Sequence, residues 1–135
     1  MVLGMTEERS MVFWQAIAHF NHRQYYECHD TLESLWMEAT EPDRSFLQGI
    51  LQIAVALYHL DHQNLRGAII LLGEGRYRLH HYCPMFFDVD ITDLVEQSGQ
   101  WLHILQMASL EESIPTGLNS YGFNPSIRPW GKVRG

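Results

Sequence analysis

The chain has 135 residues, 46% of them hydrophobic and 19% charged, which is the composition of one globular domain and not of a disordered segment. Its formal net charge of −7 argues against general binding to nucleic acids or anionic membranes. Two cysteines are too few for a disulfide framework, and we find neither a signal-peptide pattern nor an apolar run of roughly 18 residues. We therefore expect a cytoplasmic protein.

Apolar residues at helical spacing predict five helices. The sequence contains no run of alternating apolar and polar residues, so we expect no sheet. Thr6 and Asn64 have side chains suited to cap the first and the fourth helix. Gly49 lies in the middle of the third helix and indicates that another helix packs closely there. The predicted helices span about residues 6–20, 23–39, 43–60, 64–80 and 90–108.

A faint internal repeat has an offset of 40 residues, since residues 16–22 align with residues 56–62. Each copy is a helix, a short polar turn and a second helix, which resembles a tetratricopeptide-type hairpin. Two copies are fewer than the three or so that a solenoid needs. The sequence therefore predicts an all-α, compact bundle of about five helices built on two antiparallel helical hairpins.

The C-terminal segment differs in charge and composition from the rest of the chain. All sixteen acidic residues lie between Glu7 and Glu112, whereas the residues after 113 carry only basic charges. This segment is rich in Gly, Pro and Asn and has no helical period. We predict a helical domain at 1–112 and an extended, irregular arm at 113–135, anchored by its aromatic side chains on the acidic body or on a neighbouring subunit. The predicted anchors are Phe123 and Trp130.

Polar side chains form a stripe on each of two helices that a short turn connects. With about 100° of rotation per helical residue, the side chains of each stripe point within roughly 80° of one another around the helix axis. The two sets are Tyr26, His29, Glu33 and Trp36 on the second helix and Arg44, Gln48, Gln52 and His59 on the third. Antiparallel packing lets the stripes face each other. We expect Glu33 to accept hydrogen bonds from Arg44 or Gln48, and His29 to reach Gln52.

Two interpretations of the stripes remain open. The first is a buried polar network that fixes the register of the hairpin, in which case removing the Glu33 carboxylate costs about 3 kcal/mol. The second is a polar pocket in which His29 and Glu33 act as an acid–base pair or as ligands of a divalent transition metal, with His59 as the third ligand. Neither a His-Glu-x-x-His run nor facing Glu-x-x-His pairs are present to support the metal interpretation.

Histidines and cysteines outside the stripes favour structural roles. The pairs His19/His22 and His59/His62 lie at helix ends in equivalent places of the repeat. Capping of the helix is the first interpretation of these pairs, and metal binding is the alternative. Cys28 lies on the small-residue face of a hairpin, which predicts packing and not nucleophilic catalysis.

Two sequence strings resemble the signatures of domain-of-unknown-function family 309. They are YYECHDTLESLW at residues 25–36 and RSFLQGILQIA at residues 44–54, followed by ALYH at 56–59 and NLRGA at 64–68. The resemblance spans about residues 13–95 and implies a small, soluble, all-helical bacterial or archaeal protein without an assigned activity. Asp30 departs from the pattern, since the family often has Glu there. The signature polar residues correspond to Glu27, His29, Glu33, Trp36, Arg44, Gln48, Gln52, His59 and Asn64.

We interpret the chain as a non-enzymatic helical interaction or scaffold protein that has a buried polar cluster and no cofactor. It is expected to bind a protein partner or a second copy of itself. The alternative is a metal-binding protein or metal-assisted hydrolase that uses His29, Glu33 and His59, so the question of enzymatic activity stays open. The predicted polar cluster comprises the signature residues together with Tyr26.

Overall fold

The computed structural model describes residues 6–110 and 121–131 of the chain. Its elements, in chain order, are α1 (Glu7–Asn21), α2 (Tyr25–Glu38), α3 (Asp43–Asp61), α4 (Leu65–His80), β1 (Met85–Phe86), β2 (Val89–Asp90) and α5 (Ile91–Leu110). The prediction of an all-α bundle with five helices is confirmed. In the described part of the chain, no helix combines the length and the apolar character needed to span a membrane.

The expectation that the chain has no sheet is wrong in one detail, because β1 and β2 form a small antiparallel pair. Met85 lies opposite Asp90, and Phe86 lies opposite Val89. Strands of two residues are too short to show an alternating pattern, so no pattern in the sequence predicts them. The pair places the side chains of Phe86 and Phe87 against the start of α3.

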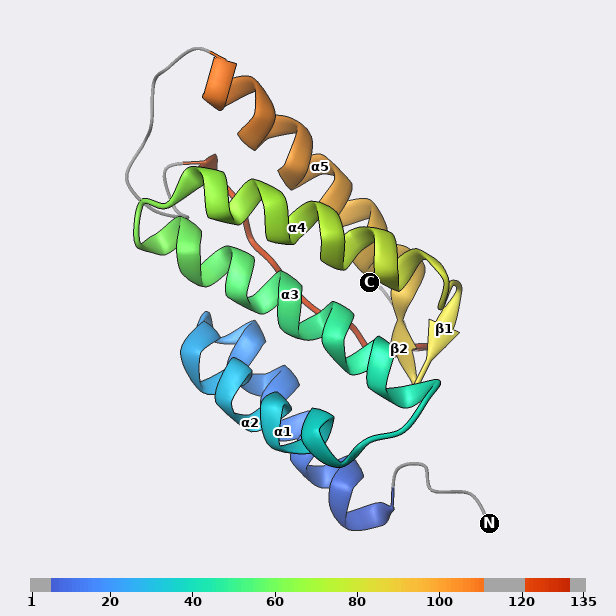
Figure 1. Cartoon of the computed structure of the whole chain (residues 1–135). Coiled ribbons are helices and arrows are strands. Elements are labelled where there is room, and N and C mark those ends of the chain that lie inside the picture. Colours follow the sequence, from blue (N-terminus) through green and yellow to red (C-terminus); the bar gives the residue numbers. More distant parts are fainter. Residues whose placement is uncertain (1–5, 111–120, 132–135) are drawn as a thin grey trace.

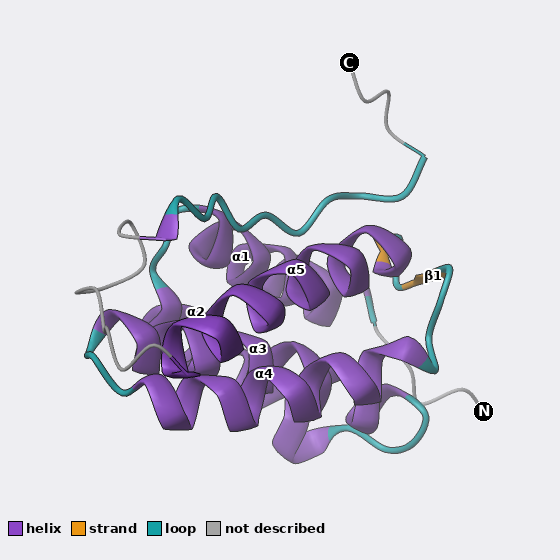
Figure 2. Cartoon of the chain, turned by 90° about the horizontal axis from the view of Figure 1, so that it is seen from above, coloured by secondary structure: helices purple, strands orange, loops and turns teal. Residues whose placement is uncertain are grey.

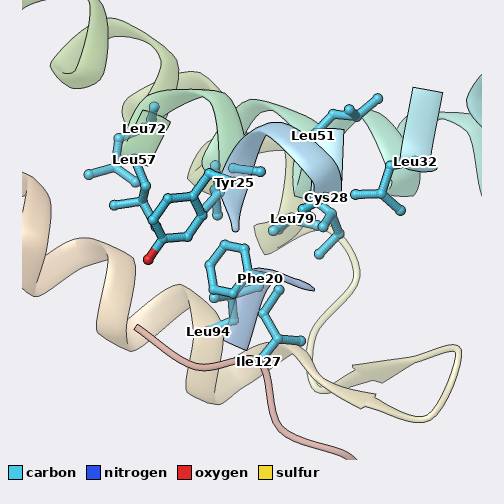
Figure 3. Close-up of a cluster of buried hydrophobic side chains, with 14 of the residues drawn as sticks. Phe20, Tyr25, Cys28, Leu32, Leu51, Leu57, Leu72, Leu79, Leu94 and Ile127 are labelled. Carbon is cyan, nitrogen blue, oxygen red and sulfur yellow. The ribbon is translucent and has the colours of Figure 1, made fainter. Parts of the chain in front are cut away.

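The helices pack in chain order, each against the next along the hairpins and turns. In Figure 1, α2, α3 and α4 lie in front, with α1 behind α2 and α5 behind α4. The central helix α3 has ten buried residues, more than any other helix. Figure 3 shows the middle of the core, where Phe20 of α1, Leu94 of α5 and Ile127 of the C-terminal arm come together.

The two hairpins repeat the same turn in detail. Arg23 and Gln63, which are 40 residues apart, both have a φ of 62°. The ring Nδ1 of His22 donates to the Ala18 carbonyl oxygen at 2.7 Å, and that of His62 donates to the Tyr58 carbonyl oxygen at 2.8 Å. These contacts support the capping interpretation of the helix-end histidines. The left-handed residue at Arg23 also explains why α2 begins two residues later than predicted.

Local signals place the starts of α1 and α4 correctly. The Thr6 hydroxyl accepts a hydrogen bond from the Arg9 backbone N–H at 3.1 Å, and the Asn64 side chain accepts one from the Gly67 N–H at 3.0 Å. At Gly49, the predicted close approach is that of α4, because a Cβ there would lie 2.8 Å from the Leu79 side chain. The helices α3 and α4 are therefore in van der Waals contact at Gly49 and Leu79, far from the turn that joins them.

The described part of the C-terminal arm, residues 121–131, lies across α1 and α5 (Figure 2). Phe123 is buried, as expected of an anchor, whereas Trp130 is 43% exposed and is not one. The second anchor is Ile127, which is 1% exposed. Trp130 is held by its backbone, whose N–H donates to the Asp88 carbonyl oxygen, and this leaves the indole ring outside the core. The boundary expected after residue 112 lies outside the described residues.

Candidate functional site

The solvent-facing side of α2, α3 and α4 carries the predicted polar stripes, and we call it the front face. It is the side turned toward the viewer in Figure 1. None of the ten predicted cluster residues is buried, so the expectation of a buried cluster is wrong. The core is filled by apolar side chains of all five helices and of the arm, which leaves the stripes outside it. We define the front face by Tyr26, His29, Glu33, Trp36, Arg44, Gln48, Gln52, Tyr58, Glu74 and Arg78.

The first group on the front face joins α2 to the C-terminal half of α3. The Tyr26 and Tyr58 rings are 6.1 Å apart, and the Tyr58 ring lies 4.1 Å from that of His62. His29 Nε2 lies 3.5 Å from Glu33 Oε2, and the two side chains are 35% and 51% exposed. This group is an aromatic patch with the solvent-exposed contact between His29 and Glu33 beside it.

The second group joins the end of α2 to the start of α3. The Arg44 guanidinium carbon lies 4.0 Å from the centre of the Trp36 ring, in a cation–π contact. Arg44 therefore stacks on Trp36 and does not bond Glu33, because the short turn brings Trp36 level with Arg44 while Glu33 lies a turn further along α2. Trp36 Nε1 and Arg44 Nε are both buried and have no hydrogen-bond partner among the described residues.

The third group joins α3 to α4 and corrects the expected partner of Gln52. Gln52 Nε2 donates to Glu74 Oε1 at 3.1 Å, and Arg78 Nε donates to Gln52 Oε1 at 3.2 Å. The expected contact between His29 and Gln52 is therefore wrong. Because α3 is central, its polar stripe has a neighbour on each side, and Gln52 lies on the α4 side.

A pocket of about 420 Å³ lies beside the third group, between the start of α3 and the end of α4. The Tyr82 hydroxyl at its rim donates to the Pro42 carbonyl oxygen at 2.7 Å. Hydrogen bonds from Ser45 hold the pKa of the nearby Glu41 carboxyl below its usual value. Sequence reasoning missed the α4 side of this pocket, although Glu74, Tyr77, Arg78 and His81 have the i, i+3, i+4, i+7 spacing of one helix face, which is the signal that could have found it. The lining residues are Ser45, Glu74, Tyr77, Arg78, His81 and Tyr82.

The remaining predicted residues have separate positions. Asn64 caps α4, and its amide donates to His59 Nδ1 at 3.4 Å, while Glu27 is exposed on α2. The described residues contain no group of three or more His, Cys, Asp or Glu side chains that can hold a metal ion. The fold thus does not join His59 to His29 and Glu33 in such a group, and the contact of His59 Nδ1 is instead with the Asn64 amide at the turn to α4.

Neither cysteine has the surroundings of a nucleophile. Cys28 is fully buried in the α1–α2 hairpin, and burial raises the pKa of its thiol to about 12. A thiol with that pKa is almost entirely protonated at neutral pH and unreactive. Cys83 is exposed and unpaired, in the turn that follows α4.

Replacing Glu33 with alanine is expected to change the free energy of unfolding by less than about 0.5 kcal/mol. The carboxylate is half exposed, and its pairing with His29 has the acidic partner on the C-terminal side, which is the weaker order on a helix. Urea unfolding of the two proteins measures the difference. A loss of about 3 kcal/mol would restore the buried-network interpretation.

Comparison with known proteins finds a family match that contains the α2 and α3 residues of the front face but not Glu74 and Arg78 of α4. The family described as "Domain of unknown function (DUF309)" matches residues 13–71. The uncharacterized protein YpuF of Bacillus subtilis (strain 168) is 47% identical over 54 residues, which cover 39% of this chain and 31% of that protein. All ten predicted cluster residues lie within the matched segment, whereas Tyr77, His81 and Tyr82 of the pocket follow it. Residues 13–71 thus match the model of domain-of-unknown-function family 309, in the segment that contains both sequence signatures.

Proposed function

We propose that the chain is a helical protein-binding module and not an enzyme, and that the front face is its binding surface. The observation that carries the proposal is the position of the family's signature side chains. They all lie outside the core, and six of the nine lie on the α2 and α3 part of the front face: His29, Glu33, Trp36, Arg44, Gln48 and Gln52. Because the apolar core forms without them, stability does not account for this concentration of polar and aromatic groups on one face.

The residue types of the front face support a protein partner. Tyrosine, tryptophan and arginine are the residues that contribute most to protein interfaces, and the face presents Tyr26, Trp36 and Arg44. Tyr26 is 61% exposed, so a partner can reach its ring. Its ring offers apolar area at a low entropic cost when a partner covers it.

The Trp36–Arg44 pair gives a second argument. Each residue has a buried donor without a hydrogen-bond partner, and such donors usually cost about 1–3 kcal/mol. A pair selected only for stability would not keep two of them. A partner that supplies carbonyl or carboxylate oxygens here gains two hydrogen bonds when the side chains turn toward it.

The charges on the front face exclude a simple polyanion as the ligand. Glu33 and Glu74 alternate with Arg44 and Arg78, so the face has no extended field of one sign. Nucleic acids select continuous basic surfaces. We infer a protein partner of mixed charge, in a reducing compartment such as the cytoplasm, which suits the free Cys28 and Cys83.

The test compares the wild type with Tyr26→Ala/Arg44→Ala, using affinity capture from the source cells followed by binding of the purified partner. We expect the double variant to keep the wild-type melting temperature and to bind at least tenfold more weakly. Met107→Ala is the matched control, since Met107 is 45% exposed on α5, away from the front face. Equal binding by the double variant, or no partner at micromolar affinity, would contradict the proposal.

A further inference from the structure

The C-terminal arm is held on α1 and α5 by side-chain amides that bind its backbone. Asn21 donates to the Ile127 carbonyl oxygen at 3.1 Å and accepts from the Ile127 N–H at 2.8 Å. Gln97 does the same for Ser126, with distances of 2.8 and 3.2 Å. Each side-chain amide therefore makes, with one residue of the arm, the two backbone hydrogen bonds that an adjacent β-strand would make. This mode of binding recognises an extended backbone whatever side chains it carries.

Side-chain specificity comes from alternating positions. Phe123, Pro125 and Ile127 are buried, while Asn124 and Arg128 between and after them are exposed. The Phe123 ring lies 6.0 Å from that of Trp101, and Figure 3 shows Ile127 next to Phe20 and Leu94. The surface thus selects an extended segment with the pattern aromatic-x-Pro-x-aliphatic. We call this surface the arm site, formed by Phe20, Asn21, Leu94, Gln97 and Trp101.

We propose that the arm site is a binding site for extended peptides of this pattern, and that a second copy of the chain supplies one by exchanging its arm. The observation behind the exchange is that the arm docks as a separate segment, with its own anchors, on α5, which precedes it, and on α1, which is far from it in sequence. Its bonds to Asn21 span 106 residues of sequence. The same contacts form whichever copy provides the arm, so exchange loses none of them.

The spacing of the chain allows the exchange. Ten residues separate the end of α5 at Leu110 from Tyr121 at the start of the described arm. A connection of that length reaches up to about 35 Å when extended, several times the diameter of a helix. An arm tethered in this way has an effective concentration on the order of millimolar at its own site. The arm of the same copy therefore prevails in dilute wild-type protein, and exchange becomes visible when that competition is removed.

The test mixes two variants of the full chain with complementary defects. Asn21→Ala/Gln97→Ala weakens the arm site and leaves the arm intact, while Ile127→Asp releases the arm and leaves the site intact. We expect each variant alone to show no added association. Fluorescence anisotropy of labelled Ile127→Asp protein should rise and reach a plateau on titration with the site variant. Sedimentation should show a one-to-one complex.

The matched control for this titration is a triple variant that carries both defects. It has the same mutated site but no functional arm, so it should leave the anisotropy unchanged. Circular dichroism first establishes that each variant is folded, and Ile127→Ala replaces the aspartate variant if that one unfolds. An unchanged anisotropy with the site variant would overturn the proposal, as would an equal rise with the triple variant.

Discussion

Replacing Phe46 with alanine is expected to lower the free energy of unfolding by about 4 kcal/mol. Phe46 begins the buried face of α3 and is completely inaccessible to solvent. Its ring lies 5.9 Å from that of Phe13 on α1, 4.9 Å from Phe86 and 5.3 Å from Phe87. Tyr82 completes the surrounding cluster at 5.5 Å. One ring thus connects α3 to α1 and to the small sheet, and its removal leaves a cavity that these elements cannot all close.

Chemical unfolding monitored by circular dichroism measures this loss. Phe46→Leu keeps most of the buried volume and should cost less than half as much. Met11→Ala on α1 serves as the exposed control, because Met11 is 64% exposed and its truncation should be nearly neutral. A loss below about 1 kcal/mol for Phe46→Ala would mean that the cluster does not join the three elements.

The helices were predictable because their signals are local. Thr6, Asn64 and Asp90 each cap a helix through a side chain within three residues of the bonded N–H, so a short stretch of sequence contains the whole interaction. The hairpin turns were predictable for the same reason, since the repeat preserves residues within a window of seven. Signals of this kind do not depend on how distant elements pack.

The anchors of the arm were only half predictable because burial there is decided by distant contacts. Phe123 and Trp130 are the large aromatic residues that composition favours, yet Trp130 is largely outside the core. Ile127 lies next to Phe20 and Leu94, and the residues that neighbour Ile127 in the sequence do not predict that it is buried there. The register of an extended segment depends on the surface that receives it.

In the candidate site, helical periodicity predicts which face of a helix a side chain lies on, whereas the packing of the helices determines which side chain it contacts. Helical spacing correctly places Gln52 and Arg44 on a polar stripe of α3, since that requires only the turn of one helix. It does not say which neighbour each side chain meets. Gln52 bonds Glu74 and Arg78 of α4, and Arg44 stacks on Trp36 of α2. The stripe is thus shared between two helices, which only the three-dimensional arrangement reveals.

The closeness of α3 and α4 is what lets Gln52 bond α4, and Gly75 maintains it. A Cβ at Gly75 would lie 3.0 Å from the Gly49 carbonyl oxygen, 3.0 Å from Ile53 Cγ1 and 3.1 Å from Gln52 Cβ. The first of these atoms belongs to the backbone and cannot rotate away. Any side chain at this position forces the two helices apart, and Gln52 moves with its backbone.

Gly75→Val is therefore expected to destabilise the protein by about 3 kcal/mol. Gly73→Val is the matched control on the same helix, because the nearest atom to a Cβ there is 3.9 Å away. Both substitutions change helix propensity by the same amount. The difference between their unfolding free energies therefore measures the cost of separating α4 from α3. Thermal and urea unfolding provide both values. Equal stability of the two variants would show that α4 can withdraw from α3 without cost, and the contacts of Gln52 with Glu74 and Arg78 would then have no fixed geometry to offer a partner.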